Sequence, residues 1–317
     1  DTAGADAAPI PHHTHAIVIL VAYPRDPDAA EPGSDWIIGA QAHRAAIRAT
    51  ENATVLAEYL RILGFDARAH SATTSDVHLP QLSLAAGLTA LQDADVHAPW
   101  LGTRFGLAAV TTDMALAPDQ PLRALAEQPA AVLRGHVWQL GTHGGVNARS
   151  HDPYAKRNFA DGPHPFETLK RVDNPTTYID APNVPRVPKR TDMFARGQFG
   201  DMGPKVQDAM KGGQHIVKSA PAAAQRRLLG AMILLQDGAI ADAPQGDTPD
   251  RNAANIKAAA YFLGVDAAGL SACPDWTWYS HDATGTPVTP PHDHALSTVI
   301  DQGFDTMEGA SGDDWIS

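Results

Sequence analysis

Residues 275–281 (DWTWYSH) form the densest group of side chains suited to bind a small aromatic molecule. The segment follows directly after a predicted strand, and aromatic rings at the end of a strand can form the wall of an apolar pocket. We therefore predict that Trp276, Trp278 and Tyr279 line a substrate pocket. The alternative is that they are ordinary core or interdomain aromatic residues.

Two groups of histidines have the residue type of a zinc site, namely His12, His13 and His15, and His281, His292 and His294. A neutral imidazole is a common Zn²⁺ ligand. Neither group is accompanied by a paired carboxylate or a cysteine motif, and His-x-His beside a proline turn is typical of a surface cluster. The sequence therefore predicts no metal site.

Other catalytic motifs are absent from the sequence. The single cysteine, Cys273, cannot form an internal disulfide or ligate an iron–sulfur cluster by itself. Gly33 and the pair Gly144 and Gly145 do not belong to a Walker or dinucleotide-binding loop. No serine or cysteine nucleophile motif occurs either.

Charge and hydropathy restrict the partners. The formal net charge of −12 disfavours nucleic acid, and no apolar run is long enough to cross a bilayer. We expect no nucleic-acid partner, no membrane span and a cytoplasmic location. Export stays open, because the sequence begins with Asp1 instead of Met.

Strands and helices alternate in the first part of the chain. Apolar, β-branched runs predict strands at 16–22 and 105–112, and a shorter strand is predicted at 65–70. Helical periodicity predicts a helix that ends at Gly64 and a second helix at 79–91. The apolar face of the first helix contains Val55, Leu56, Tyr59, Leu60 and Leu63. This order predicts a layered α/β or α+β module over residues 1–130.

The middle of the chain is less regular. The composition of residues 131–247 predicts an irregular linker that wraps on a folded body and contains a helix at 222–235. A helix at 250–263 and a strand at 265–272 follow. We assign residues 248–317 to a second module.

An internal repeat relates the two modules. Residues 11–37 align without a gap with residues 290–316, and nine of the 27 aligned positions are identical. The matches include Pro-x-His-x-His-Ala and the Asp-Trp-Ile at Trp36 and Trp315. We therefore expect a fragment that lacks the beginning of the first module and most of the second. The strand near 295–300 is then expected to lack sheet partners of its own.

Several segments, in their order along the chain, resemble the cobalamin-dependent reductive dehalogenases of the soluble, non-respiratory kind. In the first module these are residues 59–70 (YLRILGFDARAH), 75–80 (SDVHLP), 84–88 (LAAGL) and 102–116 (GTRFGLAAVTTDMAL). Residues 308–317 (EGASGDDWIS) are similar to the start of the family's catalytic module. The resemblance implies a layered module like those of nitroreductases and corrinoid-trafficking proteins.

The first module departs from the family pattern in two places. No Cys-x-x-Cys-x-x-Cys follows Leu116, and residues 92–100 replace the family's Gly-rich turn. We therefore expect a degenerate first copy that holds no corrinoid. In the second copy, the resemblance implies cofactor contacts from Ser311, Asp313 and Ser317, although Gly-Asp there is also typical of a helix N-cap.

The resemblance implies reductive removal of halide from an organohalide, with a halogenated aromatic compound as the expected substrate. Cobalamin and two 4Fe-4S clusters would serve the full-length protein, none of them held by this fragment alone. The resemblance also places the family's catalytic residues beyond Ser317, so none is expected in this chain. Its partners would be the organohalide, the missing C-terminal module and an electron donor. Two alternatives stay open: a flavin- or corrinoid-processing enzyme on a related scaffold, and a non-catalytic scaffold module.

Overall fold

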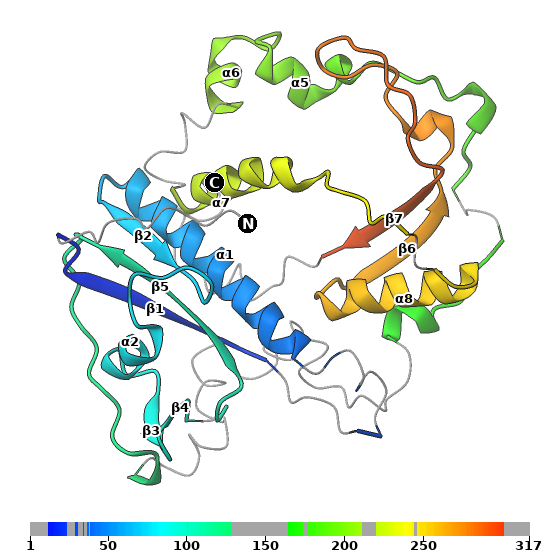
Figure 1. Cartoon of the computed structure of the whole chain (residues 1–317). Coiled ribbons are helices and arrows are strands. Elements are labelled where there is room, and N and C mark those ends of the chain that lie inside the picture. Colours follow the sequence, from blue (N-terminus) through cyan, green and yellow to red (C-terminus); the bar gives the residue numbers. More distant parts are fainter. Residues whose placement is uncertain are drawn as a thin grey trace. The chain divides into compact units, whose positions relative to one another are not determined.

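The computed structural model describes residues 12–23, 29–30, 34, 37, 39–99, 101–127, 164–173, 177–210, 220–243 and 246–300 (Figure 1). These residues belong to two compact units. The first unit contains the described residues up to 127 and residues 220–239. The second unit contains the described residues of 164–210 and 240–300.

A three-stranded sheet forms the centre of the first unit. Its order is β1 (His15–Ala22), β5 (Phe105–Thr112) and β2 (Ala67–His70), and both pairings are antiparallel. Strands β1 and β2 therefore run in the same direction, with β5 inserted between them. The strands predicted at 16–22 and 105–112 are confirmed. Antiparallel pairing beside helices makes the fold α+β.

Helix α1 (Ala40–Ile62) lies along this sheet (Figure 1). It packs on the strands through small side chains. Four alanines at four-residue spacing, each at most 2% exposed, form the buried stripe Ala45, Ala49, Ala53 and Ala57. Four-residue spacing keeps side chains on one helix face, and a methyl group lets that face lie close to the strands. The helix is followed by Gly64 with φ +94°, which confirms the predicted C-terminal glycine.

The larger apolar residues predicted for α1 point in more than one direction. Leu60 is buried in the core, whereas Val55 and Tyr59 face helix α7 (Ala220–Met232) and Leu63 is 38% exposed. Helix α7 packs on α1, and Arg227 of α7 is hydrogen-bonded to Glu58 of α1. The short 3-10 turn η6 (Ile233–Leu235) follows α7.

The helix predicted at 79–91 is shorter than expected. Helix α2 (Leu79–Ala85) begins with the His78 side chain accepting from Gln81 N–H and ends before Gly87, whose φ of +69° breaks the helical path. A hairpin then follows, formed by β3 (Ala90–Gln92) and β4 (Asp95–His97). The hairpin contains residues 92–97, part of the segment expected from the resemblance to replace the family's Gly-rich turn.

The second unit contains helix α8 (Pro249–Phe262) and a two-stranded sheet of β6 (Ala267–Ala272) and β7 (His294–Val299). The expectation that the strand near 295–300 lacks a sheet partner is wrong, because β7 pairs antiparallel with β6 over its whole length. The unit's other helical segments are η3 (Pro165–Thr168), η4 (Ala181–Asn183), η5 (Lys189–Thr191), α5 (Met193–Gln198), α6 (Pro204–Met210) and η7 (Asp275–Thr277).

Within the described residues, the two copies of the internal repeat can be compared only at their strands. Strand β1 begins at His15 and β7 at His294, which are aligned positions in the two copies. Trp36 and Trp315 lie outside the described residues, so the repeat stays a prediction. Among the helices in the described ranges, none is long and apolar enough to cross a membrane.

Gly106 of β5 gives the first testable prediction. A Cβ at this position would lie 2.8 Å from the backbone carbon of Ala45 and from the backbone nitrogen of Ala46 in α1. Because helix backbone cannot move aside locally, we expect Gly106→Ala to lower the free energy of unfolding by about 1–3 kcal/mol. Urea unfolding monitored by circular dichroism measures the change.

Gly269→Ala is the matched control for Gly106→Ala. Gly269 also lies within a strand, β6, but a Cβ there would meet no atom within 4 Å. We expect a change within about 0.5 kcal/mol or a slight stabilisation. Equal losses in the two variants would show that close helix–strand contact is not the reason.

Candidate functional site

The predicted aromatic segment lies in the second unit, just after β6. Trp276 belongs to the turn η7, and Trp278 and Tyr279 follow it. Both tryptophans are half-buried, whereas Tyr279 is exposed and its hydroxyl donates to Asp192 Oδ2 at 3.4 Å. The three rings therefore belong to one short connection that leaves the end of a strand, as the sequence analysis expected.

Arg186 holds this connection in place. Its Nη2 donates to the carbonyl oxygens of Tyr279 and Val288, both at 2.7 Å, and its Nε donates to the carbonyl of Trp278 at 3.3 Å. One guanidinium therefore satisfies three backbone acceptors that come from both sides of the loop. The sequence analysis missed Arg186, since nothing in its local sequence connects it to residues more than 90 positions away.

Backbone hydrogen bonds continue the attachment. Ser280 N–H donates to Val187 O at 2.9 Å, and Lys189 N–H donates to His281 O at 2.9 Å. On the other side, Val288 N–H donates to Ser280 O, also at 2.9 Å. The aromatic segment is therefore fixed by two neighbouring backbone segments, which limits the freedom of the rings.

The indole of Trp278 carries an unused donor. Its Nε1 is buried and makes no hydrogen bond within the part of the chain that the structure describes. A buried N–H without an acceptor costs about 1–3 kcal/mol. The lining role of Trp276, Trp278 and Tyr279 stays a prediction.

A second polar group ties the turn η3 to helix α8. Glu167 accepts from Lys257 Nζ at 2.8 Å and from the hydroxyl of Tyr261, while the ring of His164 stacks on Tyr261 at 3.8 Å. Burial, followed by the hydrogen bond to Glu167, raises the pKa of Tyr261 to about 12. The hydrogen bond from Lys257 is the main cause that lowers the pKa of Glu167. At neutral pH the phenol stays protonated beside an ionised carboxylate, an arrangement that stabilises the contact.

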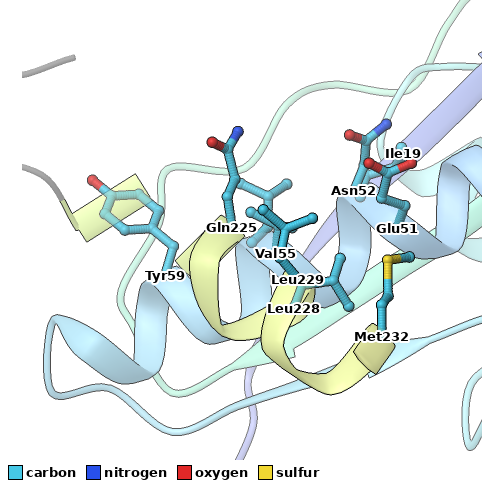
Figure 2. A pocket seen from close by; sticks show the side chains of 10 residues that line it. Ile19, Glu51, Asn52, Val55, Tyr59, Gln225, Leu228, Leu229 and Met232 are labelled. Atoms are coloured by element: carbon cyan, nitrogen blue, oxygen red, sulfur yellow. The ribbon is translucent and has the colours of Figure 1, made fainter. Parts of the chain in front are cut away.

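The first unit contains an apolar cavity of about 550 Å³ between α1 and α7 (Figure 2). Tyr59 lies at one end, and Glu51 and Asn52 lie at the other end near Met232 (Figure 2). Its lining residues are Ile19, Glu51, Asn52, Val55, Leu56, Tyr59, Gln225, Leu228, Leu229 and Met232. This volume falls in the range of cavities that hold drug-sized ligands.

The remaining predicted site residues have no described surroundings. Ser311, Asp313 and Ser317 all lie outside the residues that the structure describes, so their contacts with a cofactor stay predictions. Three residues that line the cavity between α1 and α7, Val55, Leu56 and Tyr59, were assigned by the sequence analysis to the apolar face of the first helix. Only the packing of α7 on α1 brings the two sets of side chains together.

The solved structures that are similar to this chain include those of the catabolic reductive dehalogenase NpRdhA. Its complex with 3-bromo-4-hydroxybenzoic acid is 39% identical, with a TM-score of 0.75, over 97% of this chain and 44% of that chain. A variant of NpRdhA is 40% identical over the same shares. Another reductive dehalogenase structure, described as suggesting a mechanism for B12-dependent dehalogenation, is 39% identical over 98% of this chain.

The chain spans less than half the length of these structures. No protein-family model matches the chain, and no curated protein matches it significantly.

Removing the Arg186 guanidinium is expected to loosen the aromatic segment. Arg186→Met leaves three carbonyls without their charged donor, so we expect a loss of about 2–3 kcal/mol in local stability. Faster hydrogen exchange at the amides of Ser280 and Val288 measures it. Arg251→Met is the control, because Arg251 is 74% exposed and forms only an ion pair with Asp247 at 3.2 Å. Unchanged exchange in Arg186→Met would contradict this role.

The titration of Tyr261 tests the second polar group. Its folded-state pKa of about 12 lies above the unfolded value of about 10. The stability it contributes is therefore fully present below about pH 10 and is lost as the pH rises toward 12. Difference absorbance against Tyr261→Phe isolates this phenol. Glu167→Gln should lower its pKa without restoring the ordinary value, since burial remains; a pKa unchanged by Glu167→Gln would exclude the carboxylate as a cause.

Proposed function

The chain is a relative of the reductive dehalogenases, and we propose that it acts as part of a cobalamin-dependent enzyme that removes halide from organohalides. One observation carries this proposal: nearly 40% identity to NpRdhA over 97% of the chain, with a TM-score of 0.75. This sequence identity, which extends over both compact units, is far higher than that of proteins that share only a fold. The order of the family-like segments in the sequence supports it independently.

We propose a halogenated aromatic compound as the substrate. NpRdhA was solved with 3-bromo-4-hydroxybenzoic acid bound, and this chain places Trp276, Trp278 and Tyr279 on one connection held by Arg186. Aromatic rings contribute large apolar area and stack on a bound ring. Their part would be to orient the aryl group and to exclude water from it.

The cavity between α1 and α7 is smaller than a whole corrinoid. The cavity between α1 and α7 holds about 550 Å³, the range of drug-sized ligands, and a corrinoid with its nucleotide loop is considerably larger. The single cysteine likewise cannot ligate two 4Fe-4S clusters. We propose that cobalamin and both clusters are bound by the rest of a longer protein, with Ser311, Asp313 and Ser317 at its border with this chain.

The first unit then serves as a nitroreductase-like module that has lost its cofactor. The hairpin of β3 and β4 supports this reading, because it contains residues 92–97 of the segment that, by the sequence resemblance, replaces the family's Gly-rich turn. Bound cobalamin would supply the electrons that break the carbon–halogen bond. The contribution of the present chain is to position the substrate and to support the module that holds the cofactor.

Cobalamin binding and bromide release test the proposed function together. We expect the 317-residue chain to bind cobalamin weakly or not at all and to release no bromide from an aryl bromide. The chain extended to the full length of its relatives should bind cobalamin and release bromide anaerobically when given a reductant. Visible absorbance and bromide assay are the measurements. Failure of the extended protein to release bromide contradicts the function, and tight flavin binding would favour the flavin-enzyme alternative.

Trp278→Ala in the extended protein tests the pocket wall. Loss of an aromatic contact of about 1–3 kcal/mol should lower kcat/KM for the aryl bromide by about 10- to 100-fold, while the cobalamin content stays the same. Tyr178→Ala is the control, because Tyr178 lies in the same unit and is 86% exposed. An unchanged kcat/KM in Trp278→Ala would place the substrate elsewhere.

A further inference from the structure

Two neighbouring histidines and a distant aspartate meet at one edge of the first unit. His12 Nε2 lies 2.7 Å from Asp66 Oδ2, and His13 Nε2 lies 3.4 Å from the same oxygen. One ligand atom from each of the three residues falls within 4.8 Å of the others. The sequence around His12 and His13 contains no paired carboxylate. The structure supplies one from Asp66, in the turn between α1 and β2.

His13 has a buried nitrogen that no hydrogen bond uses. Its side chain is 2% exposed, and Nε2 lies within ion-pair distance of Asp66 Oδ2, at 3.4 Å, without the alignment of a hydrogen bond to any described residue. This nitrogen faces the Asp66 carboxylate, which is the position of an unoccupied ligand atom.

The second nitrogen of His13 is held by a defined partner. His13 Nδ1 lies 2.9 Å from Thr111 Oγ1, which in turn lies 2.9 Å from His70 Nε2. Asp76 N–H donates to His70 Nδ1 at 3.3 Å, so the proton of a neutral His70 is on Nε2 and is donated to Thr111. A metal ion on Nε2 of His13 requires the ring proton to be on Nδ1, and Thr111 Oγ1 is placed to accept that proton.

Hydrogen bonds of its backbone fix the position of Asp66. Its N–H donates to Asp113 Oδ1 at 2.9 Å, while its carbonyl accepts from Thr112 Oγ1 at 2.7 Å and from Asp113 N–H at 3.3 Å. These hydrogen bonds fix the turn and leave the carboxylate to the two histidines. Outer partners that orient each ligand are characteristic of built metal sites.

We propose that His12, His13 and Asp66 bind one Zn²⁺ ion, with water as the fourth ligand. Tetrahedral Zn²⁺ with ligands at about 2.0–2.1 Å places neighbouring ligand atoms about 3.3 Å apart. The spacing of 3.4 Å between His13 and Asp66 already matches this value. The 2.7 Å contact of His12 must open by a few tenths of an ångström, which an imidazole that is 55% exposed does easily.

The ion connects the start of β1 to the turn that leads into β2. These strands lie on opposite sides of β5, so the site fastens both outer strands of the sheet at one end. A bound Zn²⁺ therefore stabilises the first unit by mass action and raises its melting temperature. The proposal is independent of the dehalogenase function, since none of the three residues belongs to the predicted substrate or cofactor site.

Zinc titration of the untagged chain tests the site. Calorimetry should give one Zn²⁺ per chain, and Co²⁺ used as a probe should give the strong visible absorbance of four-coordinate cobalt. Asp66→Asn and His12→Gln should each weaken zinc binding at least about tenfold. His12 is exposed, so His12→Gln leaves the core intact, and far-ultraviolet circular dichroism checks the fold of both variants.

Asp293→Asn is the matched control. Asp293 also lies 2.7 Å from a histidine, His294, but both side chains are more than 80% exposed and no buried histidine accompanies them. Zinc affinity in this variant should equal that of the wild type. No stoichiometric binding by the wild type, wild-type affinity in Asp66→Asn, or loss of binding in Asp293→Asn would each overturn the proposal.

Discussion

The structure of the first unit depends on how closely α1 approaches β5. The backbone of Ala45 and Ala46 lies against Gly106, where a single Cβ would come within 2.8 Å of it. The alanine stripe of α1 continues this close contact along the sheet, with Ala49, Ala53 and Ala57 fully buried. Small side chains on both surfaces are the condition for such packing, because the gap leaves no room for a larger group.

Close packing on one face of α1 directs its larger residues elsewhere. Val55 and Tyr59 face α7 and line the cavity there, as Figure 2 shows. The close packing of α1 also places the end of this helix beside the sheet. At that end of the sheet, His15 and Ala67 are both opposite Thr112. The histidines before β1 and Asp66 before β2 meet at this end because β5 holds the two outer strands in register.

The second unit is organised by polar contacts more than by a core. Arg186 fixes the aromatic connection through three carbonyls, and Glu167 joins η3 to α8. Such contacts connect segments that have little regular secondary structure and bury few large side chains. Phe194 and Phe199, for example, are 61% and 50% exposed. The rings of the proposed pocket wall are therefore positioned by hydrogen bonds from the segment that the sequence analysis assigned to a wrapping linker.

The sequence by itself indicated the similarity to reductive dehalogenases, the strand at 105–112, the glycine that follows α1 and the helices near 222–235 and 250–263. These features follow from periodicity, turn residues and ordered motifs, which are local properties. Only the tertiary structure decided that β5 lies between β1 and β2, that β7 pairs with β6, and that Asp66 joins His12 and His13. Strand pairing and long-range side-chain contacts depend on packing between distant segments, for which the local sequence carries no signal.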